Sequence, residues 1–303
     1  MKWRGRRQSS NIEDRRGERS RGMSFRSARS GRRIRLPRGG RTSGGALGLI
    51  VVAFIVMIAL GIDPRQLLEG SIPTGPSDGL STQRPVDNAA EDELASFVGV
   101  VVQETEDVWG KIFADNGLNY DPPGVVLFTS QTRSACGAAD ARTGPFYCPG
   151  DQKVYIDLSF YDQLRRQFGA PGDFAQAYVL AHEIGHHVQQ LTGELPEFNQ
   201  ARARLSTEEA NQWSIRVELQ ADCYAGVWAA YAGQANLLER GDIEEALNAA
   251  DSIGDDTLQK RMQGFAVPKT FNHGTSAQRK RWFDRGFQEG NPGACDTFAA
   301  QNP

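Results

Sequence analysis

Apolar and polar positions follow a helical period through most of the chain after residue 90. Amphipathic or buried helices are expected at residues 90–115, 173–191, 206–231, 242–251 and 276–288. Ser206 and Glu209 have the spacing of a capping box at the start of the third helix. Asp173 is a plausible N-cap for the second helix, and Gly193 is expected to end it.

Two short apolar runs predict strands in the first half of this region, at 125–128 and 154–158. A loop rich in Gly and Ser lies between them. A small mixed or antiparallel sheet is therefore expected beside the helices. The sequence contains no internal repeat, which excludes a solenoid or a propeller. The predicted fold class is α+β, mostly helical with a small sheet.

Residues 1–41 differ in charge from the rest of the chain. They contain fifteen Lys and Arg against three Asp and Glu, whereas the whole chain has a formal net charge of −3. Because this arm has few apolar residues, we expect it to be disordered. The arm has three possible functions: contact with anionic lipid, contact with nucleic acid, or a role in topology alone. Nucleic acid is the least favoured, since Trp3 and Phe25 are the only aromatic residues in the arm.

A stretch of twenty-one uncharged residues follows at 42–62. It is long enough to form one transmembrane helix. The arginines before it predict a cytoplasmic N-terminus, with the rest of the chain outside the cytoplasm on the cell membrane. A cleaved signal peptide is the alternative, because Ala59-Leu60-Gly61 resembles a cleavage site. Residues 63–89 contain four prolines and are expected to be a linker, so the predicted domain spans 90–303.

The sequence from His182 to His186 reads H-E-I-G-H, and it carries the main chemical signal of the chain. On a helix, His182 and His186 share one face and can hold a single metal ion. Glu183 can act as general base toward a metal-bound water, as in zinc hydrolases with this pattern. Three of the four histidines lie within residues 182–187, which disfavours a chance match.

A catalytic zinc site needs a third protein ligand, and the helix that begins at Ser206 offers one. Glu218 and Asp222 lie one turn apart among apolar residues, where a carboxylate needs a partner. We assign Glu218 to the metal and Asp222 to a hydrogen bond with a histidine ligand. The exchanged assignment is one alternative, and an exposed acidic face paired with Arg216 is another.

The two remaining histidines have different expected roles. His187 points about 100° away from His186 around the helix, so we expect a packed histidine rather than a ligand. His273 precedes a predicted helix and can donate a hydrogen bond to the oxyanion of a tetrahedral intermediate. The alternative for His273 is a structural role. Tyr155 is a weaker candidate for the hydrogen bond to the oxyanion.

The four cysteines contain no C-x-x-C pair, so zinc-finger spacing is absent. An exported domain would oxidise them. Cys136 with Cys148 closes the most local loop, which leaves Cys223 with Cys295. The alternative for Cys223 is a buried free thiol.

Several stretches resemble the neutral zinc metallopeptidase family of bacterial membrane-anchored proteins. They are residues 3–7, 11–16, 144–149, 154–161, 181–187, 218–223 and 273–276. The resemblance implies a zincin-like metallopeptidase domain, one Zn²⁺ per chain and a peptide or protein substrate. More distantly, the chain is similar to membrane-associated gluzincins, in which the first Glu of the second helix binds zinc, as expected here for Glu218. Gly274 departs from that pattern, because many gluzincins have Pro there.

The sequence therefore predicts a membrane-anchored zinc metallopeptidase with zinc held by His182, His186 and Glu218. Glu183 is the expected base for water that attacks a peptide carbonyl. Two other classes stay open: a non-catalytic scaffold that binds a membrane or envelope partner, and a zinc hydrolase of a non-peptide substrate. The presence of Glu183 disfavours the scaffold, since a structural metal site does not require it.

Overall fold

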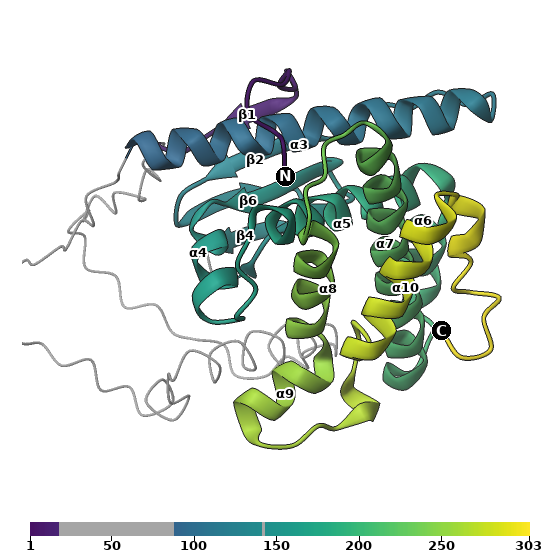
Figure 1. Ribbon diagram of the computed structural model, residues 1–303. Helices are drawn as coiled ribbons and strands as arrows, with labels where there is room; N and C mark the ends of the chain where they lie inside the picture. Colours follow the sequence, from purple (N-terminus) through teal and green to yellow (C-terminus); the bar gives the residue numbers. More distant parts are fainter. Residues whose placement is uncertain (18–87, 141–142) are drawn as a thin grey trace, which may run out of the picture. The chain divides into compact units, whose positions relative to one another are not determined.

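A four-stranded sheet is built from strands that lie far apart in the sequence (Figure 1). The computed structural model describes residues 1–17, 88–140 and 143–303. The strand order is β1 (Ile12–Asp14), β2 (Gly124–Phe128), β6 (Lys153–Asp157) and β5 (Phe146–Cys148). β1, β2 and β6 are parallel, and β5 is antiparallel to β6, so the sheet is mixed. A separate hairpin consists of β3 (Gln131–Ser134) and β4 (Gly137–Asp140).

Helices account for most of the described residues. They are α3 (Asn88–Asp115), α4 (Ser159–Arg166), α5 (Asp173–Thr192), α6 (Glu194–Arg202), α7 (Thr207–Gln234), α8 (Asp242–Ser252), α9 (Asp255–Gln263) and α10 (Ser276–Glu289), with 3₁₀ turns η2 (Pro268–Thr270) and η3 (Pro292–Cys295). Figure 1 shows α3 as a long helix across the top of the view. The five predicted helices and the two predicted strands are confirmed within a few residues.

Helix α5 lies at the centre of the domain. It packs against α3, α7 and α8 and against strands β5 and β6. Its sequence is apolar on nearly all sides, which is the pattern of a fully buried helix, and most side chains from Phe174 to Gln189 are buried. Gly172, rather than the predicted Asp173, is the N-cap, and Gly193 ends the helix at φ 105°. The histidine motif therefore lies in a rigid, buried element.

The prediction of a disordered arm is wrong for residues 1–17. β1 pairs with β2, and the side chains of Met1 and Trp3 are 5% and 8% exposed. The Trp3 ring packs edge-on against Phe97, with ring centroids 5.4 Å apart. Composition suggested disorder because the arm has few apolar residues, but Met1 and Trp3 are buried and acidic groups on α3 pair with arginines of this segment. The folded domain includes this segment as well as residues from 88 onward.

The predicted transmembrane helix at 42–62 lies outside the described residues. The same holds for residues 18–41 of the predicted arm and for most of the predicted linker. In the three described ranges, no helix has the length and apolar character needed to span a membrane.

Both predicted disulfides are confirmed. Cys136 and Cys148 join at 2.05 Å and tie the β3–β4 hairpin to β5. Cys223 on α7 joins Cys295 at 2.04 Å and holds the C-terminal segment against that helix.

Helices α7 and α10 cross in close contact because two glycines meet the facing backbone. A Cβ atom at Gly226 would overlap the carbonyl oxygen of Phe283, and one at Gly286 would overlap that of Cys223. No residue with a side chain fits at either position without moving the helices apart. This contact sets α10 against the face of α7 that carries Asp222.

Candidate metal centre

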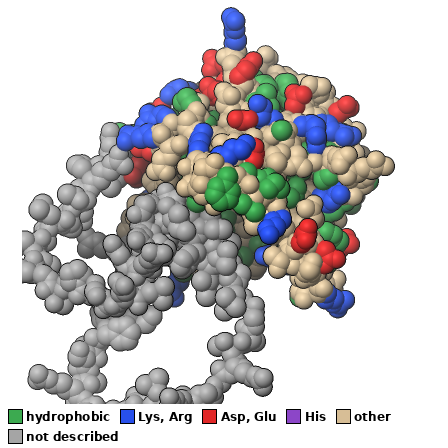
Figure 2. Space-filling model, turned by 90° about the horizontal axis from the view of Figure 1, so that it is seen from below, with side chains coloured by type: hydrophobic (Ala, Val, Ile, Leu, Met, Phe, Trp, Pro, Cys, Tyr) green, Lys and Arg blue, Asp and Glu red, His purple; other side chains and the backbone are tan. Residues whose placement is uncertain are grey.

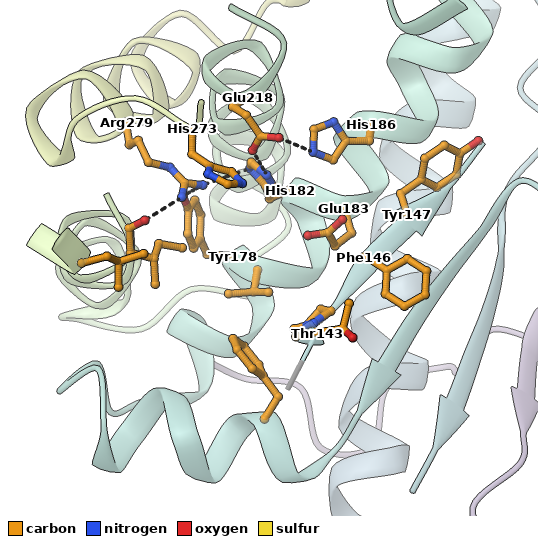
Figure 3. A pocket seen from close by; sticks show the side chains of 16 residues that line it. Thr143, Phe146, Tyr147, Tyr178, His182, Glu183, His186, Glu218, His273 and Arg279 are labelled. Atoms are coloured by element: carbon orange, nitrogen blue, oxygen red, sulfur yellow. Dashed lines mark hydrogen bonds and ion pairs between the residues drawn. The ribbon is translucent and has the colours of Figure 1, made fainter. Parts of the chain in front are cut away.

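Helices α5 and α7 bring His182, His186 and Glu218 together (Figure 3). One ligand atom from each residue lies within 4.8 Å of the others. His182 Nε2 is 3.2 Å from Glu218 Oε2, and His186 Nε2 is 3.7 Å from Glu218 Oε1. In a tetrahedral site with bonds of about 2.0–2.2 Å, neighbouring ligand atoms are roughly 3.3–3.6 Å apart. The donor set and its spacing therefore fit zinc.

A small residue between the two histidines permits this spacing. A Cβ atom at Gly185 would lie 3.1 Å from the Cα and carbonyl oxygen of Ala221, tighter than an ordinary contact. The two helices thus approach closely at the level of the histidines. Glu218, one turn before Ala221, can reach the Nε2 atoms of both rings only because the backbones are this near.

The other ring nitrogen of His182 is held by a buried network. His182 Nδ1 donates to Asp222 Oδ1 at 2.8 Å, and Asp222 is 0% exposed. Tyr178 donates its hydroxyl to the same oxygen at 2.5 Å. Arg279 on α10 donates to both Asp222 oxygens, at 2.8 and 2.9 Å. The network leaves Nε2 as the ring nitrogen of His182 that faces Glu218, as the predicted role of Asp222 requires.

The tautomer of His186 follows from a second set of hydrogen bonds. The amide nitrogen of Gln189 donates to Val217 O at 2.7 Å and to Gln220 Oε1 at 2.9 Å. Gln189 Oε1 must then face His186 Nδ1, which lies 2.9 Å away and donates to it. His186 Nε2 is therefore unprotonated. It points toward Glu218, as Nε2 of His182 does.

Charges within the site are strongly coupled. Burial would lower the pKa of His182, but Asp222 and Glu218 outweigh it and raise that pKa to about 10. Burial would raise the pKa of Asp222, but Arg279 and His182 bring it down to about 2. The pKa of Glu218 likewise falls well below its usual range, because His273, His186 and His182 outweigh burial. The cluster therefore holds anionic carboxylates around a position suited to a cation.

Glu183 faces the cavity beside the three candidate ligands (Figure 3). It is 9% exposed, and burial raises the pKa of its carboxyl to about 7, although the backbone N–H of Tyr147 works against this rise. A carboxylate with a pKa near neutrality can both accept and release a proton.

The cavity in front of these residues has a volume of about 420 Å³. Its lining combines apolar side chains with the polar groups described above: Thr143, Gly144, Pro145, Phe146, Tyr147, Phe160, Tyr178, Val179, His182, Glu183, His186, Glu218, Ile253, Leu258, His273 and Arg279. A mostly apolar cavity with convergent polar groups is typical of a site for a small molecule or a side chain of a larger substrate.

His273 reaches this cavity, whereas Tyr155 does not line it. The side chain of His273 is 48% exposed, and its Nδ1 lies 3.2 Å from Asp255 Oδ1. Asp255 also accepts the backbone N–H groups of His273 and Gly274, at 2.7 and 3.1 Å, which fixes the loop. Tyr155 is buried and donates to Asp151 Oδ2 at 2.7 Å, so it does not act as the alternative donor.

His187 packs away from the three candidate ligands. Its Nε2 donates to the carbonyl oxygen of Asp121 at 2.7 Å, so its Nδ1 accepts from the Tyr147 hydroxyl at 3.0 Å. Burial lowers the pKa of His187, which keeps the ring neutral. The ring thus joins α5 to strand β5, whose Tyr147 also contacts Glu183 through its backbone.

Sequence reasoning did not identify Arg279, Tyr178, Gln189 or Tyr147 as parts of the site. Arg279 carried a usable signal, since it belongs to the buried face of α10 with Trp282 and Phe283. An arginine on an apolar helix face needs a buried acid as partner, and Asp222 was the available one. The other three give no comparable signal.

Comparison with known proteins gives consistent relatives. A family model described as "Putative neutral zinc metallopeptidase" matches residues 1–298. The uncharacterized protein YpfJ of Escherichia coli K12 is 48% identical over 298 residues, which cover 98% of this chain and 99% of YpfJ. The uncharacterized protein Rv2575 of Mycobacterium tuberculosis is 45% identical over 192 residues, covering 60% of this chain and 64% of Rv2575. No solved structure matches the chain.

Proposed function

Since the chain belongs to the neutral zinc metallopeptidase family, we propose that it hydrolyses peptide bonds with one zinc ion held by His182, His186 and Glu218. The observation that carries the proposal is the convergence of these three ligand atoms within 4.8 Å, next to buried Glu183. Both imidazoles direct Nε2 toward Glu218 in this arrangement. A zincin-like fold is part of the proposal, supported by the helix pair that carries the ligands.

Zinc bound there would bring the pKa of a coordinated water to about 7 and polarise a substrate carbonyl. Glu183 accepts a proton from the attacking water, and its pKa of about 7 suits this role at neutral pH. The same carboxyl then donates the proton to the nitrogen of the leaving amine. His273, which lines the cavity, donates a hydrogen bond to the carbonyl oxygen as negative charge develops on it.

The remaining polar residues of the site hold the ligands in place. Asp222 fixes the ring of His182, and Arg279 keeps Asp222 ionised within the protein interior. Gln189 fixes the ring of His186 through its amide oxygen. Apolar cavity walls at Val179, Ile253 and Leu258 exclude water from the reacting groups and provide contact area for a substrate side chain.

The domain is proposed to work outside the cytoplasm, attached to the cell membrane through residues 42–62. Two disulfides support this location, because they persist in oxidising compartments. Nucleic acid is not a proposed partner. On the face seen in Figure 2, Lys and Arg side chains are interspersed with Asp and Glu rather than gathered into a basic surface.

Metal content and peptide turnover of single variants test the proposal. Glu218→Ala removes one of three ligands, so the purified chain should lose stoichiometric zinc. Glu183→Gln keeps the ligand set, so zinc should remain while turnover falls by about 10²-fold or more. Asp222→Asn should weaken zinc affinity by about 10–100-fold. Glu208→Ala, at an exposed position of the same helix as Glu218, is the control and should change neither quantity.

The results also separate the alternatives. If Glu218→Ala retains full zinc while Asp222→Asn loses it, the two carboxylates exchange roles. Full peptide turnover by Glu183→Gln contradicts the mechanism. Stoichiometric zinc in the unmodified chain without hydrolysis of any peptide in a broad library favours the scaffold or a non-peptide substrate.

A further inference from the structure

Residues 11–15 are an integral part of the sheet that borders the metal centre. Ile12 lies opposite Val125 and Asp14 opposite Leu127 in the parallel pairing of β1 with β2. The backbone N–H of Val125 donates to Asn11 O at 2.8 Å, and that of Arg15 donates to Leu127 O at 2.8 Å. β2 continues through β6 to β5, the strand beside Glu183. The first strand of the chain thus completes the domain that holds the candidate ligands.

The residues before β1 are fixed at two further places. Lys2 N–H donates to Leu237 O at 2.7 Å, after the end of α7, and Ser9 N–H donates to Gly99 O at 2.9 Å on α3. Met1 and Trp3 belong to the main hydrophobic core. These contacts use backbone groups and buried apolar surface, so they specify one position for the segment rather than a loose electrostatic association.

Arginines of this segment face the protein. Arg6 pairs with Glu104 at 2.8 Å, and Arg7 pairs with Asp107 at 2.9 Å, both on α3. Arg16 pairs with Asp92 of the same helix at 2.9 Å. The positive charge of residues 1–17 therefore complements the acidic side of α3.

The position of this segment limits the membrane topology of the chain. A chain that crosses a bilayer once has its two flanks on opposite sides. Between residues 18 and 87, the sequence has one uncharged stretch of twenty-one residues, enough for one helical crossing and too short for two. Strands β1 and β2 share one hydrogen-bonded ladder, so the two flanks of that stretch must lie on the same side.

We propose that residues 1–17 occupy the same compartment as the metal centre, because they form part of the same folded domain. The expected cytoplasmic location of the N-terminus opposite an external domain is replaced by a common location for both. This inference rests on the fold and is independent of the proposed peptidase activity.

Cysteine labelling of the full chain in intact cells tests the common location. Ser10→Cys and Gln301→Cys introduce thiols at two exposed positions, one near each end of the domain. A membrane-impermeant maleimide is applied before and after permeabilisation, with the chain lacking both substitutions as the blank. We expect both positions to be labelled under the same condition. Labelling of one position in intact cells and of the other only after permeabilisation would overturn the proposal.

A second experiment tests the contact itself. A Cβ atom at Gly99 would lie 3.2 Å from Cβ of Gln8, so Gln8→Cys with Gly99→Cys is close to the geometry of a disulfide. Mild oxidation of intact cells should join the two positions, which peptide mass spectrometry detects, and neither single variant should give that product. If the double variant folds with its two native disulfides but forms no bridge between positions 8 and 99, the segment does not dock on the domain and the inference fails.

Discussion

Replacing Arg279 by methionine leaves the buried Asp222 carboxylate without its arginine partner. Arg279 is 4% exposed and Asp222 is 0% exposed, and two hydrogen bonds of 2.8 and 2.9 Å join them. Removing one partner of a buried ion pair costs about 3–5 kcal/mol, because the remaining charge stays desolvated. In a domain of this size, 1 kcal/mol corresponds to about 2–4 °C. We therefore expect the melting midpoint of metal-free R279M to fall by roughly 6–20 °C.

The loss of stability in R279M should depend on pH in a defined direction. In the folded wild type, the pKa of Asp222 lies at about 2, below the value of about 3.9 for an unfolded Asp. A depressed pKa stabilises the fold above the unfolded value, and this contribution is lost as pH falls through the folded value. The difference in unfolding free energy between wild type and R279M should thus be largest near neutrality and shrink between about pH 4 and pH 2.

Denaturant unfolding of the metal-free chains at a series of pH values measures both effects. Arg281→Met, at an exposed position of the same helix, is the matched control and should stay within about 0.5 kcal/mol of wild type. Adding Asp222→Asn to R279M should recover part of the loss, because the carboxylate that lost its arginine partner is then neutral. An R279M chain within about 1 kcal/mol of wild type at pH 7, or a difference that persists unchanged at pH 2, would refute the reasoning.

Three further outcomes follow from the described contacts. Because the pKa of His182 is about 10 without metal, zinc must displace a proton from this ring. The apparent zinc affinity should therefore rise about tenfold per pH unit from pH 6 to 9. A chelator competition in which zinc affinity does not depend on pH contradicts the prediction. Deleting residues 1–16 exposes the edge of β2 and removes two buried side chains worth about 1.5–3 kcal/mol each. Denaturant unfolding should therefore show a stability lower by several kcal/mol. An equally stable truncated chain argues against an integral strand. Tyr147→Phe leaves His187 Nδ1 without a hydrogen bond and should lower the free energy of unfolding by about 1–3 kcal/mol. Zinc content should stay unchanged. Loss of zinc would show that His187 supports the candidate ligands.

Long helices could be predicted because their signals are local. The apolar period and the terminal residues of α5 and α7 lie within each segment, and the Ser206 capping box is present as expected. α4 was not predicted, since it has eight residues and no side-chain cap. β1 was not predicted either, because Ile-Glu-Asp has little strand character of its own. Its conformation is decided by β2, far along the chain.

The candidate ligands could also be predicted, because their signals lie within single helices. His182 and His186 are brought together by the geometry of a single helix, and Glu218 was selected by the chemistry that a buried carboxylate requires. Arg279 contacts Asp222 across 57 residues, and only the packing of α10 on α7 brings them together. Gln189 acts through amide orientation, which depends on its contacts with α7.

The parallel pairing of β1 with β2 also sets an order in time for biosynthesis. Ile12 leaves the ribosome first, but its partner Val125 follows 113 residues later, and Leu237, the acceptor for Lys2, later still. At synthesis rates of about 5–20 residues per second, the segment waits roughly 6–23 s for its place in the sheet. During that interval its apolar residues, including Trp3, are open to chaperones and to wrong partners. Folding of the domain is therefore completed at the end of synthesis rather than progressively along the chain.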